Sequence, residues 1–158
     1  MRNYKVTAIV AVRKIMRISN ERTGISLTET PVKTITLGNG SELKLYDRSQ
    51  KIAGDRWRVS LIARMEVPIS CLTSAEADRV SASADEIKSA LGTYAVFEHK
   101  SERNFVAEKK KDEIFNGLCD SFLKSSLSYL SHCEFPARFI VKSYKTYIKK
   151  TILSGIRK

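Results

Sequence analysis

The chain has 158 residues, of which 42% are hydrophobic and 28% are charged, with only 7 glycines and 3 prolines. This composition excludes a disordered or fibrous protein, and the length suits one hydrophobic core, so we expect a single domain spanning residues 1–158. The formal net charge of +11 favours an anionic partner.

The cysteines and histidines form no metal-binding pattern. Cys71, Cys119 and Cys133 include no C-x-x-C pair, and an odd number of cysteines leaves one without a disulfide partner. The only close pair is His132 next to Cys133, whereas structural zinc takes four ligands in two close pairs. We therefore expect no metal, no cofactor and a cytoplasmic location.

The N-terminal apolar run at residues 6–12 is too short to span a bilayer. It is followed by Arg13 and Lys14, where a signal peptide would offer small residues for cleavage. We expect a strand there and no transmembrane segment.

The first half of the chain has the patterns of β-strands. Residues 33–37 and 42–46 flank Asn39-Gly40, which predicts a β-hairpin because both residues tolerate positive φ. Residues 56–67 alternate between two kinds of side chain, which predicts a strand with one face in the core and the other largely basic, as at Arg58 and Arg64. The face expected in the core carries Trp57, Val59, Leu61, Ala63, Met65 and Val67.

The middle of the chain combines a helix with further strands. Pro68 ends the long strand, and Thr73-x-x-Glu76 predicts a capping box that starts one helix over residues 74–91, closed by Gly92. Residues 93–99 predict another strand, with a turn at 100–103 and a short return at 104–106.

Two helices complete the chain, one over residues 108–131 and one from Pro136 to about residue 152. In the last helix Ile140, Tyr144, Ile148 and Ile152 recur on one face, and we expect this face to join Phe115 in the core. Strands early and helices late predict an α+β fold, with a mostly antiparallel β-sheet packed on one face by about three helices. The strand order does not follow from the pattern.

The segment from Asp47 to Arg56 is the first candidate for a small-molecule site. Arg48, Lys51 and Arg56 could pair with phosphate or carboxylate oxygens, because arginine presents a forked donor and lysine a point charge. A plainer interpretation is that the aspartates form Asx turns, Gly54 supplies a tight turn and the cations are solvated.

This segment also resembles a known group of sequences. Tyr46-Asp-Arg-Ser49 followed by Ala53-Gly-Asp-Arg-Trp57 is similar to the core of some short bacterial proteins of uncharacterised function, over roughly residues 43–67. Looser similarity occurs near Asn104-Phe105 and Phe135-Pro136. The resemblance implies no activity, so no functional residue is carried over from it.

The last helix supplies the second candidate. Arg138, Lys142, Lys145 and Lys149 form a basic row that could follow a polyanion such as nucleic acid or an acidic protein, with salt-dependent binding. The alternative is a solvated face near a helix C-terminus, where cations complement the macrodipole.

No catalytic motif is present, so we predict no catalytic residues. The leading hypothesis is a non-catalytic binding or regulatory module for an anionic partner. Two alternatives stay open. One is a small-ligand enzyme or sensor that uses the Asp47 to Arg56 segment, and the other is an interaction subunit whose late helices bind another protein or a second copy.

Overall fold

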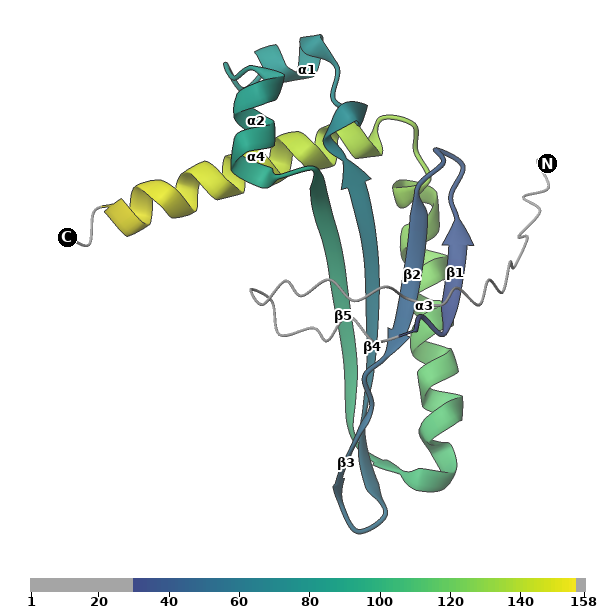
Figure 1. The fold of residues 1–158 in the computed structure, drawn as a ribbon. Coiled ribbons are helices and arrows are strands. Elements are labelled where there is room, and N and C mark those ends of the chain that lie inside the picture. Colours follow the sequence, from purple (N-terminus) through teal and green to yellow (C-terminus); the bar gives the residue numbers. More distant parts are fainter. Residues whose placement is uncertain (1–29, 156–158) are drawn as a thin grey trace.

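Strand β4 (Arg56–Pro68) is the centre of the sheet, and the computed structural model describes residues 30–155. One edge of β4 pairs with two short strands, β2 (Glu42–Asp47) and β3 (Gln50–Ala53). Its other edge pairs along its whole length with β5 (Tyr94–Ala107), and β1 (Lys33–Thr36) lies outside β2 (Figure 1). All of these pairs are antiparallel.

Helices cover one face of this sheet, which confirms the α+β prediction. After the short 3-10 turn η2 (Glu108–Lys110), helix α3 (Lys111–Leu130) packs along β4 and β5. Helix α4 (Phe135–Gly155) crosses one end of the sheet (Figure 1). Among residues 30–155, no helix has both the length and the apolar character needed to cross a membrane.

The alternation predicted for β4 places its apolar face in the core. Leu61 and Val67 are fully buried, and Trp57 is half-buried at the edge of the core. From α3, Phe115 and Phe122 pack against this face. The hairpin predicted at Asn39-Gly40 is also present as β1 and β2, and Gly40 has a φ of 83°, a conformation that glycine adopts without strain.

The helix expected over residues 74–91 is instead two helices, and that prediction was wrong in detail. They are α1 (Ser74–Asp78), which follows the 3-10 turn η1 (Ile69–Cys71), and α2 (Ala84–Leu91). The capping box forms at Ser83 and Glu86, whereas the Thr73 side chain caps no backbone N–H. Ser83 starts the second helix, because its hydroxyl accepts a hydrogen bond from the Glu86 N–H in the new first turn.

The turn expected at residues 100–103 was also wrong, because β5 continues from Tyr94 to Ala107. Its residues pair with β4 from Pro68 down to Arg56. A turn would have left that edge of β4 without hydrogen-bond partners, so the long β4 template keeps β5 extended. One irregularity remains near Phe105, whose φ is +58°.

The expectation for the last helix holds only in its first half. Phe135 and Ile140 of α4 are buried, whereas Ile148 and Ile152 are 37% and 57% exposed. The predicted contact of Ile148 with the core is therefore wrong, because α4 runs beyond the edge of the sheet and has no strand beneath its second half (Figure 1). The strand expected at residues 6–12 lies outside the described residues.

Candidate functional site

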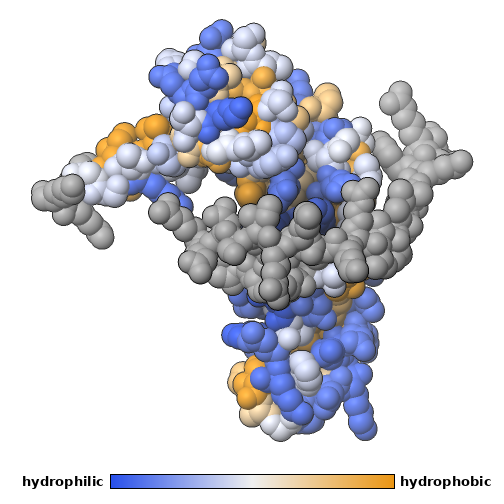
Figure 2. Space-filling view, viewed as in Figure 1, coloured by the Kyte–Doolittle hydropathy of each residue, from blue (hydrophilic) through white to orange (hydrophobic). Residues whose placement is uncertain are grey.

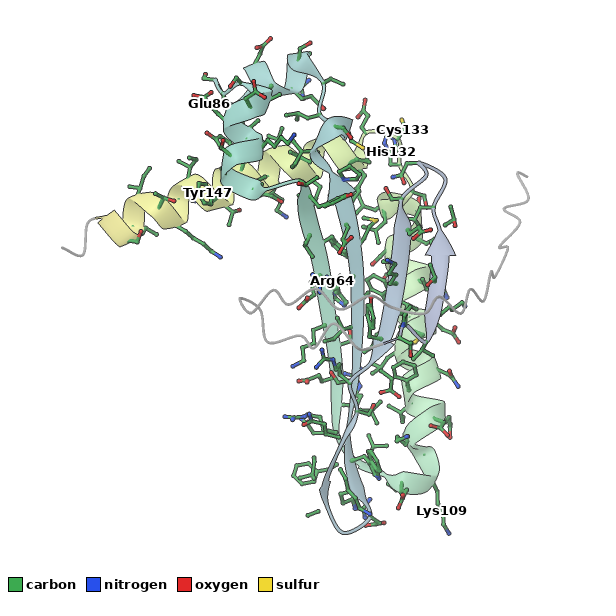
Figure 3. All side chains as sticks on the ribbon, viewed as in Figure 1. Arg64, Glu86, Lys109, His132, Cys133 and Tyr147 are labelled. Carbon is green, nitrogen blue, oxygen red and sulfur yellow. The ribbon has the colours of Figure 1, made fainter. Side chains whose placement is uncertain are left out.

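A cavity of about 460 Å³ lies over the face of the sheet opposite α3. Strands β2 and β4 form its floor, the β1–β2 turn and η1 contribute to its rim, and β5 contributes its first residue. The lining side chains that matter for its chemistry are Lys44, Tyr46, Arg48, Ile62, Arg64 and Tyr94, together with the carboxylates Glu42 and Glu66. Arg64 lies in the middle of the sheet in Figure 3.

The period of two along each strand explains why these side chains converge. Alternate residues of a strand point to the same face, so the residues between the core positions of β2 and β4 face outward. The antiparallel register then sets Lys44 opposite Arg64 and Tyr46 opposite Ile62. Two strands that are separate in sequence therefore bring their polar faces together over one cavity.

The cavity lining has three cations, Lys44, Arg48 and Arg64, and two carboxylates, Glu42 and Glu66, while Glu98 of β5 lies opposite Arg64 on its other side. Lys44 and Arg64 are directly opposite each other, an arrangement that destabilises a sheet when the charges are alike. The nearest carboxylate to Lys44 is that of Glu42, with Nζ and Oε2 4.0 Å apart. The Nε atom of Arg64 is buried and has no hydrogen-bond partner among residues 30–155. A bound anion would offset both features.

The remaining wall of the cavity is aromatic and aliphatic. Tyr46 and Ile62 lie side by side across β2 and β4, and Tyr94 at the start of β5 is 49% exposed. Tyrosine offers an apolar ring face and a hydroxyl that forms hydrogen bonds. The cavity can therefore contact an apolar or planar group as well as an anion.

The structure separates the three residues proposed from the Asp47 to Arg56 segment. Arg48 lines the cavity, and its backbone N–H donates to the Ser60 carbonyl oxygen at 2.8 Å. Lys51 and Arg56 lie instead on the exposed β3–β4 hairpin, away from that cavity. Only Arg48 of this set shares a site with Lys44 and Arg64.

Much of that segment follows the plainer interpretation. Asp47 Oδ1 accepts a hydrogen bond from the Ser49 N–H at 2.9 Å, which is an Asx turn. Gly54 has a φ of 53° in the tight turn between β3 and β4, and the Asp55 and Arg56 side chains lie 3.5 Å apart. Lys44 and Tyr46 were not predicted as site residues, although their spacing with Arg48 at alternate positions was a signal for one shared face.

The basic row of α4 lies outside this cavity. Arg138 is paired with Glu134, with Nη2 and Oε2 2.5 Å apart, which reduces its availability to a partner. Lys142, Lys145 and Lys149 are exposed, and α4 contains no acidic residue. The row is therefore a separate cationic surface.

Other reactive side chains do not assemble into a site. The ring of His99 stacks on Phe122 with centroids 4.8 Å apart, and its Nε2 lies 2.9 Å from the Ser101 hydroxyl on an exposed surface. Burial raises the pKa of the Cys119 thiol, and the Asp120 carboxylate adds to this effect, so the thiol stays protonated at neutral pH. No group of three or more metal-ligating residues occurs within the described part of the chain.

Comparisons of the chain with models of protein families, with curated proteins and with solved structures find no match. We therefore infer the class of ligand from the side chains that line the cavity. Its cations and aromatic wall fit an anionic ligand that also carries an apolar or planar part.

Proposed function

We propose that this chain is a non-catalytic binding module that holds a small anionic ligand in the cavity over β2 and β4. One observation carries the proposal: Lys44 and Arg64 are directly opposite in the same cavity, and the buried Nε of Arg64 has no partner among residues 30–155. An anion between these two cations would relieve their repulsion and accept the unused N–H. The cations would then bind ligand instead of stabilising the free protein.

The cavity also limits the chemistry of the ligand. Its volume of about 460 Å³ lies within the range typical of small-molecule sites. A carboxylate or phosphate suits the guanidinium groups, because arginine donates two parallel hydrogen bonds to such groups. Glu42 and Glu66 on the same lining would repel a long polyanion. A compact molecule with one anionic group and a ring that contacts Tyr46 fits best.

Ligand screening with an arginine variant tests this proposal. The probes are inorganic phosphate, nucleoside monophosphates and aromatic carboxylates, with thermal shift and calorimetric titration as readouts. We expect Arg64→Gln to weaken binding of the best probe by about tenfold or more while the fold is retained, because one charge-assisted hydrogen bond is lost.

Arg58→Gln is the matched control. Arg58 is an exposed arginine of the same strand, it does not line the cavity, and it donates to Gln50. Its substitution should leave the affinity unchanged. Equal losses in both variants, or no binding of any probe to the wild type, would contradict the proposal.

A second candidate function is supported by α4. Its exposed lysines Lys142, Lys145 and Lys149 lie on a helix without carboxylates, so the row could contact nucleic acid phosphates. Charge reversal at these three positions should weaken binding to nucleic acid and reduce its salt dependence. Charge reversal at Lys124, an exposed lysine of α3, serves as the control. A nucleic acid affinity that does not change with salt concentration would exclude this candidate.

A further inference from the structure

The end of the sheet farthest from α4 carries exposed apolar side chains. We define the arm tip as residues 50–58 and 103–110, where the β3–β4 hairpin, the end of β5 and η2 meet (Figure 1). Phe105 is 73% exposed and Ile52 is 47% exposed, on the two strands that flank β4. Figure 2 shows an apolar patch at this lower end of the molecule, surrounded by hydrophilic surface. Two large apolar residues therefore contact water at one convex end.

The backbone holds Phe105 in this position at a cost. Its φ of +58° is disfavoured for a bulky side chain, and it coincides with an irregular register between β5 and the Trp57–Val59 part of β4. Such bulges redirect side chains, and strained conformations cluster at functional sites. Asparagine or glycine would adopt this conformation more easily, so the exposed phenylalanine ring is not explained by folding.

Cations surround these two apolar side chains. The arm tip has six exposed basic residues, which are Lys51, Arg56, Arg58, Arg103, Lys109 and Lys110. Lys109 lies at the lower end of the molecule in Figure 3. The carboxylates of the same segments are Asp55, which pairs with Arg56, and Glu108. The arm tip therefore combines an apolar centre with a net positive rim.

The part of β5 next to the arm tip, residues 98–102, which we call the stem, has a different charge balance. Further along β5, Lys100 pairs with Glu102 at 2.7 Å, and Glu98 lies opposite Arg64. The cationic excess is thus concentrated at the tip. This distribution suits a flat anionic surface approached end-on, whereas a nucleic acid duplex lying along the arm would meet the carboxylates of the stem.

We propose that the arm tip binds the surface of an anionic lipid bilayer. Phe105 and Ile52 enter the interface between headgroups and acyl chains, and the surrounding lysines and arginines contact anionic headgroups. The chain then associates peripherally with one leaflet, through a convex end that projects from the sheet. This interaction goes beyond the proposed ligand binding and does not depend on the cavity.

Vesicle binding of the full chain tests this inference, with co-sedimentation and tryptophan fluorescence as readouts. Trp57 is the only tryptophan and lies half-buried in the arm tip with Lys111 Nζ 4.7 Å from its ring centroid, so its emission reports changes in its surroundings when the arm tip binds. We expect binding to phosphatidylcholine vesicles that contain phosphatidylserine, with a blue shift of Trp57 emission and a decline at high salt. Vesicles of phosphatidylcholine alone should bind little.

The decisive variant is Phe105→Asn. Asparagine tolerates positive φ, so the melting temperature should stay equal or rise, while vesicle partitioning falls by about tenfold or more because a large apolar group is lost. Leu153→Asn is the matched control, since Leu153 is 65% exposed on α4, far from the arm tip. Charge reversal at Lys51 and Arg103 should also reduce partitioning.

Three outcomes would overturn the inference. Phe105→Asn could bind vesicles as the wild type does, or Leu153→Asn could lose as much binding, which would assign the contact to α4. The wild type could also bind duplex oligonucleotides but no anionic vesicles, which would assign the arm tip to nucleic acid. Arg64→Gln should leave vesicle binding unchanged, so failure of the cavity proposal is distinguishable from failure of this one.

Discussion

The two halves of α4 carry similar apolar patterns but have different surroundings. In the first half, Phe135 is 3% exposed and packs against three aromatic rings, those of Phe97, Tyr129 and Phe139. In the second half, Ile148 is 37% exposed, and every residue from Lys145 to Gly155 is exposed. The same helical periodicity therefore contributes to the core only where another element lies beneath it.

This difference predicts unequal stability losses along one helix. Phe135→Ala should lower the free energy of unfolding by about 3–5 kcal/mol, because a buried ring is replaced by a cavity. Ile148→Ala should change it by less than about 1 kcal/mol, since little apolar surface is lost and alanine favours a helix. Urea unfolding of both variants measures the two values. Equal losses would show that the second half of α4 is buried in solution, for instance against a second copy.

Substitutions on the two faces of β4 should show the same difference between a buried and a half-buried side chain. Leu61 is fully buried, so Leu61→Ala should cost about 2–5 kcal/mol. Its neighbour Ile62 points to the cavity and is half-buried, so Ile62→Ala should cost about 1 kcal/mol or less. Urea unfolding again separates the two. A large loss for Ile62→Ala would mean that the cavity face also belongs to a packed core.

The smallest expected effect concerns Glu102 on the outward face. Its hydrogen bond with Lys100 lowers the pKa of the Glu102 carboxyl below the usual value of 4.5, and the Ser60 hydroxyl also hydrogen-bonds to it. Because the pKa is lower in the folded state, this carboxylate stabilises the protein above pH 4.5, and that contribution is lost as the pH falls through the folded-state pKa.

Urea unfolding of the wild type and Glu102→Gln between neutral and acidic pH measures this contribution. The wild type should be slightly more stable near neutral pH, and the difference should shrink on acidification below about pH 4.5. A difference that is independent of pH would show that packing of the side chain, and not its charge, matters at this position.

Part of the candidate site was predictable from the sequence. The alternation along residues 56–67 indicated that Arg58 and Arg64 face away from the core, and Arg48 was recognised as a candidate anion ligand. Their neighbours could not be predicted, because the opposition of Lys44 and Arg64 depends on the register between β2 and β4. The grouping of Arg48 with Lys51 and Arg56 was a prediction from proximity in sequence, and the extended β3–β4 hairpin separates these residues in space.

Local patterns by themselves determined that β1, β2, β4, α3 and α4 form, where the β1–β2 hairpin turns and which face of β4 is apolar. Each of these depends on side chains a few residues apart, through alternation, helical spacing or turn chemistry. Tertiary structure alone decided that β5 continues without a turn, that the second half of α4 stays exposed, and that Lys44 lies opposite Arg64. These features depend on which distant segment supplies hydrogen-bond partners or apolar contacts, and a local pattern carries no information about that partner.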